Sequence, residues 1–507
     1  MTNRTSRTTL QGNGASWRRG RTILVALAVA AVLGPALARM ERLGADEPAP
    51  ALPERDRYLL LDARVVERSE NAVLRVGAVE KHPANPLLQT AEFPFEEYTD
   101  NLYPNVLYDA EEGVYKCWYL SVLRGWGHNY RDDLGPQDKI GSGSLKMNYA
   151  VSEDGLEWSK PKMNLFTYQG EPTNVVAAGN HGTGIFKDPR DPDPERRYKM
   201  FTCMRHGTVA VAFSPDGFHW SDYQTVKTGD PLGNLRADTH NNAFWAPELE
   251  KYVGISRGWP DRIRTVVRME SADFVEWTDP VEVFRGPREA QTYSMPVFEY
   301  AGVYFGLASI YRETTDRRVH LKLTWSPDTV RWEAVERGRE FIPLSPDPEA
   351  FDYGTVYAAA TPIVGEDDIR IYYGATKERH THLRLQSSLA LATLRPDGWA
   401  GYVPDDASKP AVVTTVPIQC TGSTLTVTCD AHGGSVTVAV VDDSAKVLAL
   451  SAPITTDVTD AAVRWQAAGG LKPFVGKRIR LRFEVVGAKL YSFGMVADTV
   501  DPVTPVP

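Results

Sequence analysis

The sequence predicts an all-β fold: a five-bladed β-propeller followed by a small antiparallel β-sandwich. The first observation is a Ser-x-Asp…Trp element that recurs, with a degenerate fifth copy, RPDGWAGY, at 395–402. Each copy follows an alternating strand pattern and carries residues typical of a tight hairpin turn. Radial repetition of four-stranded blades protects sheet edges, which favours a propeller. The four complete copies are SEDGLEW (152–158), SPDGFHW (214–220), SADFVEW (271–277) and SPDTVRW (326–332).

A second marker repeats out of phase with the first. A tyrosine opens a short strand after a turn in each repeat, and no helical pattern separates the repeats. Two interleaved markers in each unit favour blades over a stack of separate sandwiches. The five marker tyrosines are Tyr115, Tyr198, Tyr252, Tyr304 and Tyr372.

The composition changes after the last repeat. Aromatic residues become rare, and short strands rich in Thr, Val and Ala follow. We therefore expect a propeller over 75–405, a β-sandwich over 406–498 and a Pro-rich tail over 499–507. Residues 39–74 are interpreted as a linker and lead-in, because they begin with a Pro-rich, charged stretch.

The N-terminus indicates export. Residues 1–22 contain five arginines and no acidic residue, and an apolar run over 23–38 ends in Ala-Leu-Ala. This pattern is typical of a secretory signal peptide, here residues 1–38, and an uncleaved signal anchor is the alternative. We expect a secreted or periplasmic protein, with membrane anchoring by the N-terminal segment as the other outcome.

Charge and cysteine content limit the partners. Loss of the five N-terminal arginines would change the net charge from −9 to −14, which disfavours nucleic acid and anionic lipid. The sequence has no CxxC motif or Cys/His cluster, so we expect no metal and no cofactor. Cys420 and Cys429 flank TGSTLTVT, read as a turn and a strand, and are expected to form a disulfide across that hairpin.

The candidate site residues lie just before the innermost strand of each blade. These strands converge on a central channel in a propeller, so their preceding residues can meet at one funnel. Glycoside hydrolysis needs two carboxyl-type groups, one to donate a proton and one to attack or to activate water. The catalytic candidates are Asp100, Asp238, Glu289 and His240, and the substrate-binding candidates are Asn101, His181, Gln291, Tyr293 and Asp352.

Other polar residues are assigned structural positions. Asp109 and Asp188 fall at the far end of their inner strands and are interpreted as turn residues. The repeated aspartates of the Ser-x-Asp elements belong to peripheral hairpins. His380 and His382, in the KERHTHL loop, are expected to be solvated.

Six segments resemble the bacterial five-bladed glycoside hydrolases of families 32, 43 and 117. They are NPLL (85–88), DNLYPNV (100–106), RRYKM (196–200), NNAFW (241–245), YSMPVF (293–298) and IRIYYG (369–374). The resemblance implies a catalytic aspartate at Asp100, expected as nucleophile or general base, and further acid groups at Asp238 and Glu289, expected as candidate proton donors. An arrangement like that of family 117 would instead make His240 the acid. The chain lacks an NDPNG motif, and Lys187-Asp188-Pro189 matches the Arg-Asp-Pro motif of family 32 only in part.

The sequence therefore predicts an exported glycoside hydrolase that acts on a polysaccharide or oligosaccharide, with a carbohydrate as its partner. A non-catalytic carbohydrate-binding propeller is the alternative, because the same funnel residues could bind a sugar without cleaving it. A transferase or phosphorylase would need basic residues near the acceptor site.

Overall fold

The computed structural model describes residues 51–89, 96–123, 145–168, 170–204, 207–228, 235–382 and 385–496. The chain divides into two compact units, Met1–Met40 and Glu41–Pro507, and all described residues belong to the second. The proposed signal peptide and the C-terminal tail lie outside the described residues. Within the described ranges, no helix is both long and apolar enough to cross a membrane. Short 3-10 helices are η1 (Pro194–Arg196), η3 (Pro247–Leu249), η4 (Pro260–Arg262) and η5 (Lys472–Phe474).

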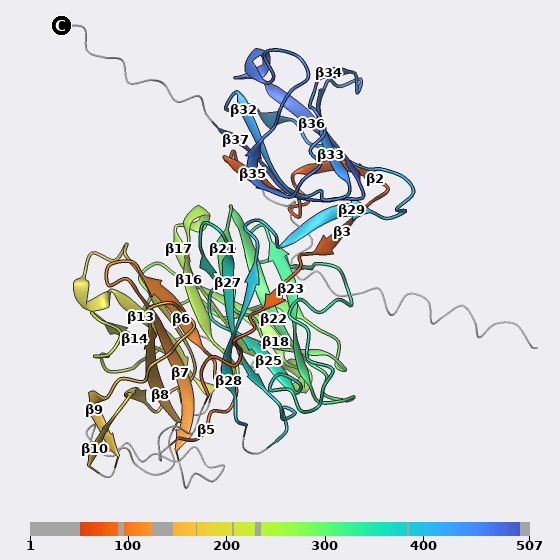
Figure 1. Cartoon of the computed structure of the whole chain (residues 1–507). Coiled ribbons are helices and arrows are strands. Elements are labelled where there is room, and N and C mark those ends of the chain that lie inside the picture. Colours follow the sequence, from red (N-terminus) through yellow and green to blue (C-terminus); the bar gives the residue numbers. More distant parts are fainter. Residues whose placement is uncertain are drawn as a thin grey trace, which may run out of the picture. The chain divides into compact units, whose positions relative to one another are not determined.

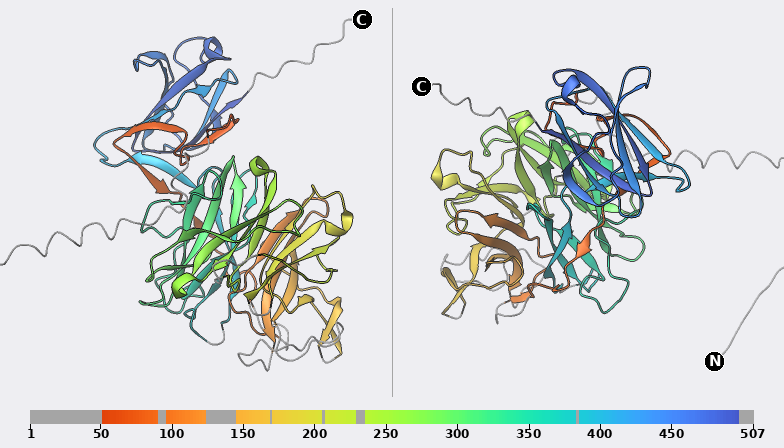
Figure 2. Two further views of the ribbon diagram at one scale, coloured as in Figure 1. Left: turned by 180° about the vertical axis from the view of Figure 1, so that it is seen from behind. Right: turned by 45° about the horizontal axis from the view of Figure 1, so that its top comes forward.

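Antiparallel sheets follow one another along the repeat region, defined here as residues 96–394 (Figures 1 and 2). The first sheet has the order β11-β8-β7-β5, with β6 also on β7: β5 (Glu96–Tyr98), β6 (Asn105–Asp109), β7 (Val114–Leu123), β8 (Leu145–Ser152) and β11 (Val175–Ala178). A hairpin of β9 (Met163–Tyr168) and β10 (Glu171–Thr173) precedes β11. The second sheet is β12 (His181–Lys187), β13 (Tyr198–Cys203), β14 (Val209–Ser214) and β15 (Gln224–Thr225). The third is β16 (Asn242–Ala246), β17 (Lys251–Gly258), β18 (Thr265–Ser271) and β19 (Val281–Arg285).

The last two repeats form one continuous ten-stranded sheet. A single parallel contact, Val319 with Thr355, joins two groups that are otherwise antiparallel. The first group is β20 (Gln291–Ser294), β21 (Val297–Tyr300), β22 (Val303–Tyr311), β23 (Val319–Ser326) and β24 (Glu333–Ala334). The second is β25 (Thr355–Ala358), β26 (Ile363–Val364), β27 (Ile369–Thr376), β28 (Ser388–Leu394) and β4 (Glu80–Lys81). A strand from the N-terminal part of the chain therefore completes the last group.

The Ser-x-Asp elements form hairpin turns through bonds from side chain to backbone. In the first element, Oδ1 of Asp154 accepts from the backbone N–H groups of Leu156 and Glu157 at 2.8 and 2.9 Å. The hydroxyl of Ser152 accepts from the N–H of Gly155 at 2.8 Å. The same bonds to Oδ1 recur at Asp216, Asp273 and Asp328. The repeated aspartates are turn residues, as the sequence predicts.

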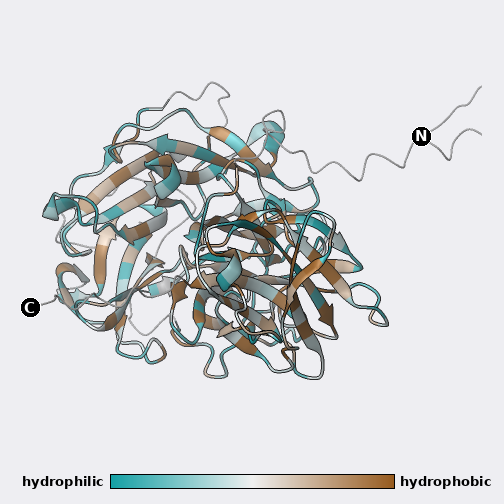
Figure 3. Ribbon diagram, turned by 90° about the horizontal axis from the view of Figure 1, so that it is seen from above, coloured by the Kyte–Doolittle hydropathy of each residue, from teal (hydrophilic) through white to brown (hydrophobic). Residues whose placement is uncertain are grey.

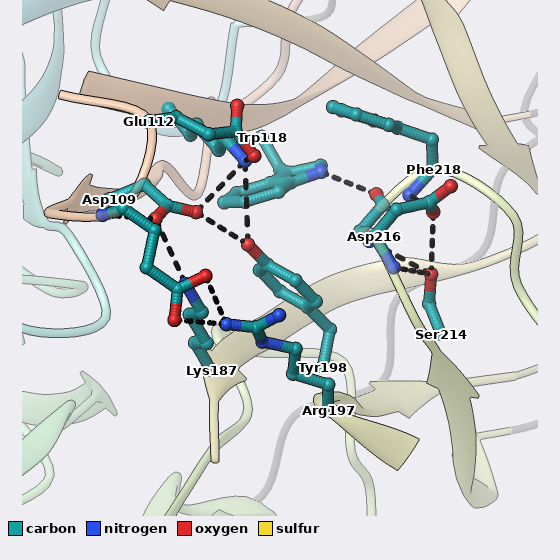
Figure 4. A network of polar contacts seen from close by, with 12 residues as sticks. Asp109, Glu112, Trp118, Lys187, Arg197, Tyr198, Ser214, Asp216 and Phe218 are labelled. Atoms are coloured by element: carbon teal, nitrogen blue, oxygen red, sulfur yellow. Dashed lines mark hydrogen bonds and ion pairs between the residues drawn. The ribbon is translucent and has the colours of Figure 1, made fainter. Parts of the chain in front are cut away.

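The marker tyrosines bind neighbouring sheets together. Figure 4 shows Tyr198 of β13 donating to Asp109, at the end of β6 in the preceding sheet, at 2.9 Å. Lys116 and Lys187 also donate to this carboxylate, at 3.0 and 2.9 Å. Burial alone would raise the pKa of Asp109, but these three bonds hold it well below its usual range. Asp109 accepts from the backbone N–H of Glu111 at 3.2 Å, as a turn residue does, and it is also a buried link between sheets.

The same link recurs in the next sheets. Tyr252 donates to Asp188 at 2.6 Å, and Tyr304 donates to Glu248 at 2.5 Å. Asp188 is buried and also lies 3.1 Å from Nζ of Lys199. The sequence interpretation of Asp188 as a simple turn residue therefore misses its contact with the following sheet.

Replacing Tyr252 with phenylalanine is expected to lower the free energy of unfolding by about 1–3 kcal/mol, because a buried bond to a carboxylate is lost. Urea denaturation measures the change. Tyr108→Phe is the matched control, since Tyr108 is 46% exposed and should change stability by less than about 0.5 kcal/mol. Equal stability of Tyr252→Phe and the unmodified protein would show that the bond contributes nothing.

Two further six-stranded sheets share one hydrophobic core. One is β1 (Arg57–Leu59), β3 (Ala72–Val76), β29 (Ala400–Pro404), β32 (Thr424–Asp430), β35 (Val458–Ala462) and β37 (Lys489–Val496). The other is β2 (Val66–Glu70), β30 (Ala411–Thr415), β31 (Ile418–Gln419), β33 (Ser435–Val441), β34 (Val447–Leu450) and β36 (Arg478–Val486). Alternating residues of β33 and β36 pack with residues of β32 and β37. Figure 3 shows hydrophobic segments along the strands and hydrophilic segments in many loops.

The N-terminal lead-in is not a linker throughout. Strands β1, β2 and β3 pair with β37, β30 and β29, so residues 57–76 are part of these two sheets. The pairing joins segments more than 300 residues apart, and no local sequence pattern reports it. Strand β29 also lies before the boundary expected at residue 406.

The disulfide expected between Cys420 and Cys429, which both lie among the described residues, is not formed. Both residues are buried, and no bond joins them. Cys420 follows β31, which pairs with β36 of one sheet, whereas Cys429 belongs to β32 of the other sheet. The intervening segment crosses between sheets and is not a hairpin, which removes the basis of the expectation.

Candidate functional site

The loop before β6 holds Asp100 in an unusual backbone conformation. Asp100, Leu102 and Tyr103 have φ values of 47°, 62° and 45°, a region that residues with a Cβ rarely adopt. Ser387 supports the loop: its hydroxyl donates to the carbonyl oxygen of Asp100, and its N–H donates to the hydroxyl of Thr99 at 2.8 Å. Strain of this kind is concentrated at functional sites. The loop leaves the side chain of Asp100 31% exposed.

His181, the first residue of β12, lies between two aspartates. Its Nε2 is 3.4 Å from Oδ2 of Asp100, and its Nδ1 is 3.3 Å from Oδ1 of Asp238. The next residue, Gly182, has a φ of +54°, and a Cβ there would lie 1.5 Å from the carbonyl oxygen of Thr239. Only glycine allows the loop of Asp238 to approach β12 this closely.

Asp238 lies in the loop before β16 and is held by Arg257 of β17. Nη2 of Arg257 donates to Oδ2 of Asp238 at 2.9 Å, and Nε donates to the carbonyl oxygen of Arg236 at 3.0 Å. The Arg257 side chain is 3% exposed, whereas that of Asp238 is 42% exposed. Burial would raise the pKa of Asp238, but Arg257 and His181 outweigh it and lower the pKa. Asp238 is therefore a carboxylate at neutral pH.

The four side chains form a row in which acidic and basic groups alternate. Burial would lower the pKa of His181, but the bond with Asp100 and the charge of Asp238 outweigh it and raise the pKa. One imidazole ring separates the contacting oxygens of Asp100 and Asp238, so they lie within about 9 Å of each other, a span that includes the carboxyl separations of glycosidases. Two accessible carboxylates thus flank one buried histidine that can hold a proton.

Aromatic side chains form the surroundings of this row. The Tyr103 ring lies 5.5 Å from that of His181 and 5.9 Å from that of Tyr357. The hydroxyl of Tyr357 is 3.0 Å from Nδ1 of His380, whose ring lies 4.5 Å from that of Tyr293. His380 is therefore packed among tyrosines and is not the solvated loop residue that the sequence suggests. A few polar groups set among aromatic side chains are typical of ligand sites.

His240 does not fit the role of proton donor. It is buried, its Nδ1 lies 3.3 Å from the carbonyl oxygen of Ala358, and its Nε2 has no hydrogen-bond partner among the described residues. Burial lowers its pKa to about 4, so the ring is neutral at neutral pH. Its ring lies 5.2 Å from that of Tyr103, so it packs against the same tyrosine that contacts the ring of His181.

Three of the proposed substrate-binding residues lie in the same aromatic and polar surroundings. Asn101 is buried and donates to the hydroxyl of Tyr103 at 2.8 Å. Gln291 is buried and accepts from Nη1 of Arg264 at 3.0 Å. The guanidinium of Arg264 lies 5.3 Å from the ring centre of Tyr293. Asn101, Gln291 and Tyr293 support the site by packing and hydrogen bonds. They are too buried to contact a substrate without movement.

Glu289 and Asp352 are placed elsewhere. Glu289 is exposed in the turn before β20, and among the described residues it makes no hydrogen bond or ion pair. Asp352 is buried and is bonded to Lys81 of β4, so it holds the N-terminal strand in place. Among the described residues, neither Glu289 nor Asp352 contacts Asp100, His181 or Asp238.

The sequence motifs assign no role to Arg257 or Arg264, the two arginines that contact Asp238 and Gln291. The sequence signal that could have identified Arg257 is a basic residue near the end of an apolar strand, in the segment KYVGISRG. Within the described ranges, no group of three or more His, Cys, Asp or Glu side chains is arranged to hold a metal ion.

Comparisons with known proteins give distant structural similarity. No protein-family model matches the chain, and no curated protein matches it. A glycosyl hydrolase from Bacteroides ovatus is 16% identical, covers 62% of this chain and 94% of its own, and gives a TM-score of 0.44. A family 43 arabinoxylan arabinofuranohydrolase from Bacillus subtilis is 11% identical, with coverages of 83% and 99% and a TM-score of 0.39. A β-1,2-mannobiose phosphorylase from Listeria innocua is 13% identical, with coverages of 62% and 96% and a TM-score of 0.43.

Proposed function

We propose that this protein is a glycoside hydrolase that cleaves a glycosidic bond in a polysaccharide or oligosaccharide. The observation that carries the proposal is the pair of accessible carboxylates, Asp100 and Asp238, which lie 3.4 and 3.3 Å from the two nitrogens of His181. A site that only bound sugars would have no need to hold two carboxylates this close to each other. Hydrolysis by paired acid and base groups needs that arrangement.

The two aspartates have different tasks in this proposal. Asp238, kept ionised by Arg257 and His181, acts as the base that takes a proton from water, or as the nucleophile at the anomeric carbon. The Asp100–His181 pair supplies the proton that the leaving oxygen gains as its bond to the anomeric carbon breaks. Either route consumes one water molecule for each bond cleaved.

The same proposal includes the architecture and the location of the protein. The successive sheets of the repeat region are the blades of a five-bladed β-propeller, and the two six-stranded sheets with a common core are a β-sandwich. Residues 1–38 act as the export signal. These assignments are supported by the repeats, the strand pairing and the N-terminal sequence.

The purified protein without residues 1–38 should release reducing sugars from at least one member of a panel of plant, algal and fungal polysaccharides and their oligosaccharides. Proton NMR of the first product identifies the released sugar and its anomeric configuration. Binding of a glycan, measured by calorimetry, without release of any sugar would favour the carbohydrate-binding alternative.

A further inference from the structure

Lys146, in β8, is a buried lysine without a carboxylate. The described residues include three lysines that are buried, and the other two each contact two acidic side chains. Those contacts join Lys116 to Asp109 and Glu112, and Lys199 to Asp188 and Asp191. Lys146 is 3% exposed, and among the described residues it makes no hydrogen bond or ion pair. Burial of most of a lysine side chain is costly for its ammonium group unless a counter-charge accompanies it.

Two other polar side chains face the same way as Lys146. Ser121 lies directly opposite Lys146 on the neighbouring strand β7, and Asn148 is two residues further along β8. Opposed residues of an antiparallel pair share one face of the sheet, as do residues two apart on one strand. The hydroxyl of Ser121 and both amide atoms of Asn148 are buried without a hydrogen-bond partner in the described chain. Both side chains are fully buried.

We propose that Lys146, Ser121 and Asn148 form a binding site for one small monovalent anion of the halide class. The ammonium supplies one positive charge, so one negative charge neutralises it. The hydroxyl and the amide NH₂ group supply further donors on the same face of the sheet, and buried donors of this kind require an acceptor. The inference is independent of the proposed glycosidase activity, because none of the three residues belongs to the Asp100–His181–Asp238 row.

The electrostatics of Lys146 agree with this assignment. Burial lowers its pKa to about 8, so the group is still mainly an ammonium at neutral pH. Lys160 provides the contrast within the same sheet region, because it reaches Oε2 of Glu96 at 2.9 Å. The anion neutralises the Lys146 ammonium group, as the Glu96 carboxylate neutralises that of Lys160.

The test compares chloride with gluconate, a much larger monovalent anion, at constant sodium concentration and ionic strength. The full chain should show a saturable rise in Tm of about 2–4 °C as chloride replaces gluconate. The variant Lys146→Met should lose this dependence. Lys251→Met should keep it, because Lys251 is 47% exposed and its loss changes only the surface charge.

A second measurement does not depend on any variant. Crystals of the unmodified protein grown in bromide should show an anomalous peak within hydrogen-bond distance of Nζ of Lys146. A Tm that does not respond to chloride, a response that persists in Lys146→Met, or a bromide crystal without this peak would each overturn the proposal.

Discussion

Replacing Asp238 with asparagine is expected to reduce kcat by about 10²–10⁴-fold, because the ionised base or nucleophile is removed while the side-chain shape is kept. Asparagine can still accept the bond from Nη2 of Arg257 through its amide oxygen. It cannot neutralise the buried guanidinium, so Tm should fall as well. The measurement is kcat, KM and Tm on the substrate identified by the glycan panel.

The change should appear in kcat, with KM altered less, because the carboxylate acts on the reacting bond. Asp216→Asn is a suitable control, since Asp216 is an aspartate of a peripheral hairpin turn. Asp216→Asn should retain turnover and lose only stability. Full activity of Asp238→Asn would show that Asp238 is not a catalytic residue.

Replacing Asp100 with asparagine should likewise reduce turnover by about 10²–10⁴-fold, because the Asp100–His181 pair loses the group that delivers its proton. The Asp100 side chain is 31% exposed and its backbone is held by Ser387, so the fold and glycan binding should survive. Turnover, calorimetric binding and Tm separate these effects.

Asp188→Asn is the matched comparison. It weakens a buried carboxylate that accepts from Tyr252 and contacts Lys199. Unfolding free energy should fall by about 1–3 kcal/mol, while turnover stays within about tenfold. If Asp188→Asn abolished turnover at unchanged stability and Asp100→Asn remained active, the catalytic motif would be Lys187-Asp188-Pro189.

The parts of the fold that sequence patterns predict are those held by local bonds. The Ser-x-Asp hairpins close through bonds between residues two or three apart, so a few consecutive residues are enough to specify each turn. Alternating apolar residues mark the strands for the same reason. Pairing of β1–β3 with strands near the C-terminus depends on contacts far apart in the chain and leaves no local signal.

The candidate site shows the same division. Asp100 and Asp238 were found because each precedes an inner strand, β6 and β16. The proton-holding role of His181 arises from two carboxylates that are 81 and 57 residues away along the chain. The sequence alone therefore identifies His181 only as a substrate-binding candidate. Glu289 shares the position before an inner strand, but it is exposed and contacts none of these three residues. Position before a strand thus identifies candidates, and only packing decides which of them meet.

The most direct test of the proposed active site is a crystal structure of Asp238→Asn with an uncleaved oligosaccharide substrate. We expect the glycosidic oxygen to lie about 2.6–3.2 Å from the Asp100 carboxyl group, directly or through one water molecule, and the anomeric carbon to face residue 238. A glycan bound with its glycosidic bond away from both positions would contradict the assignment of this row as the active site.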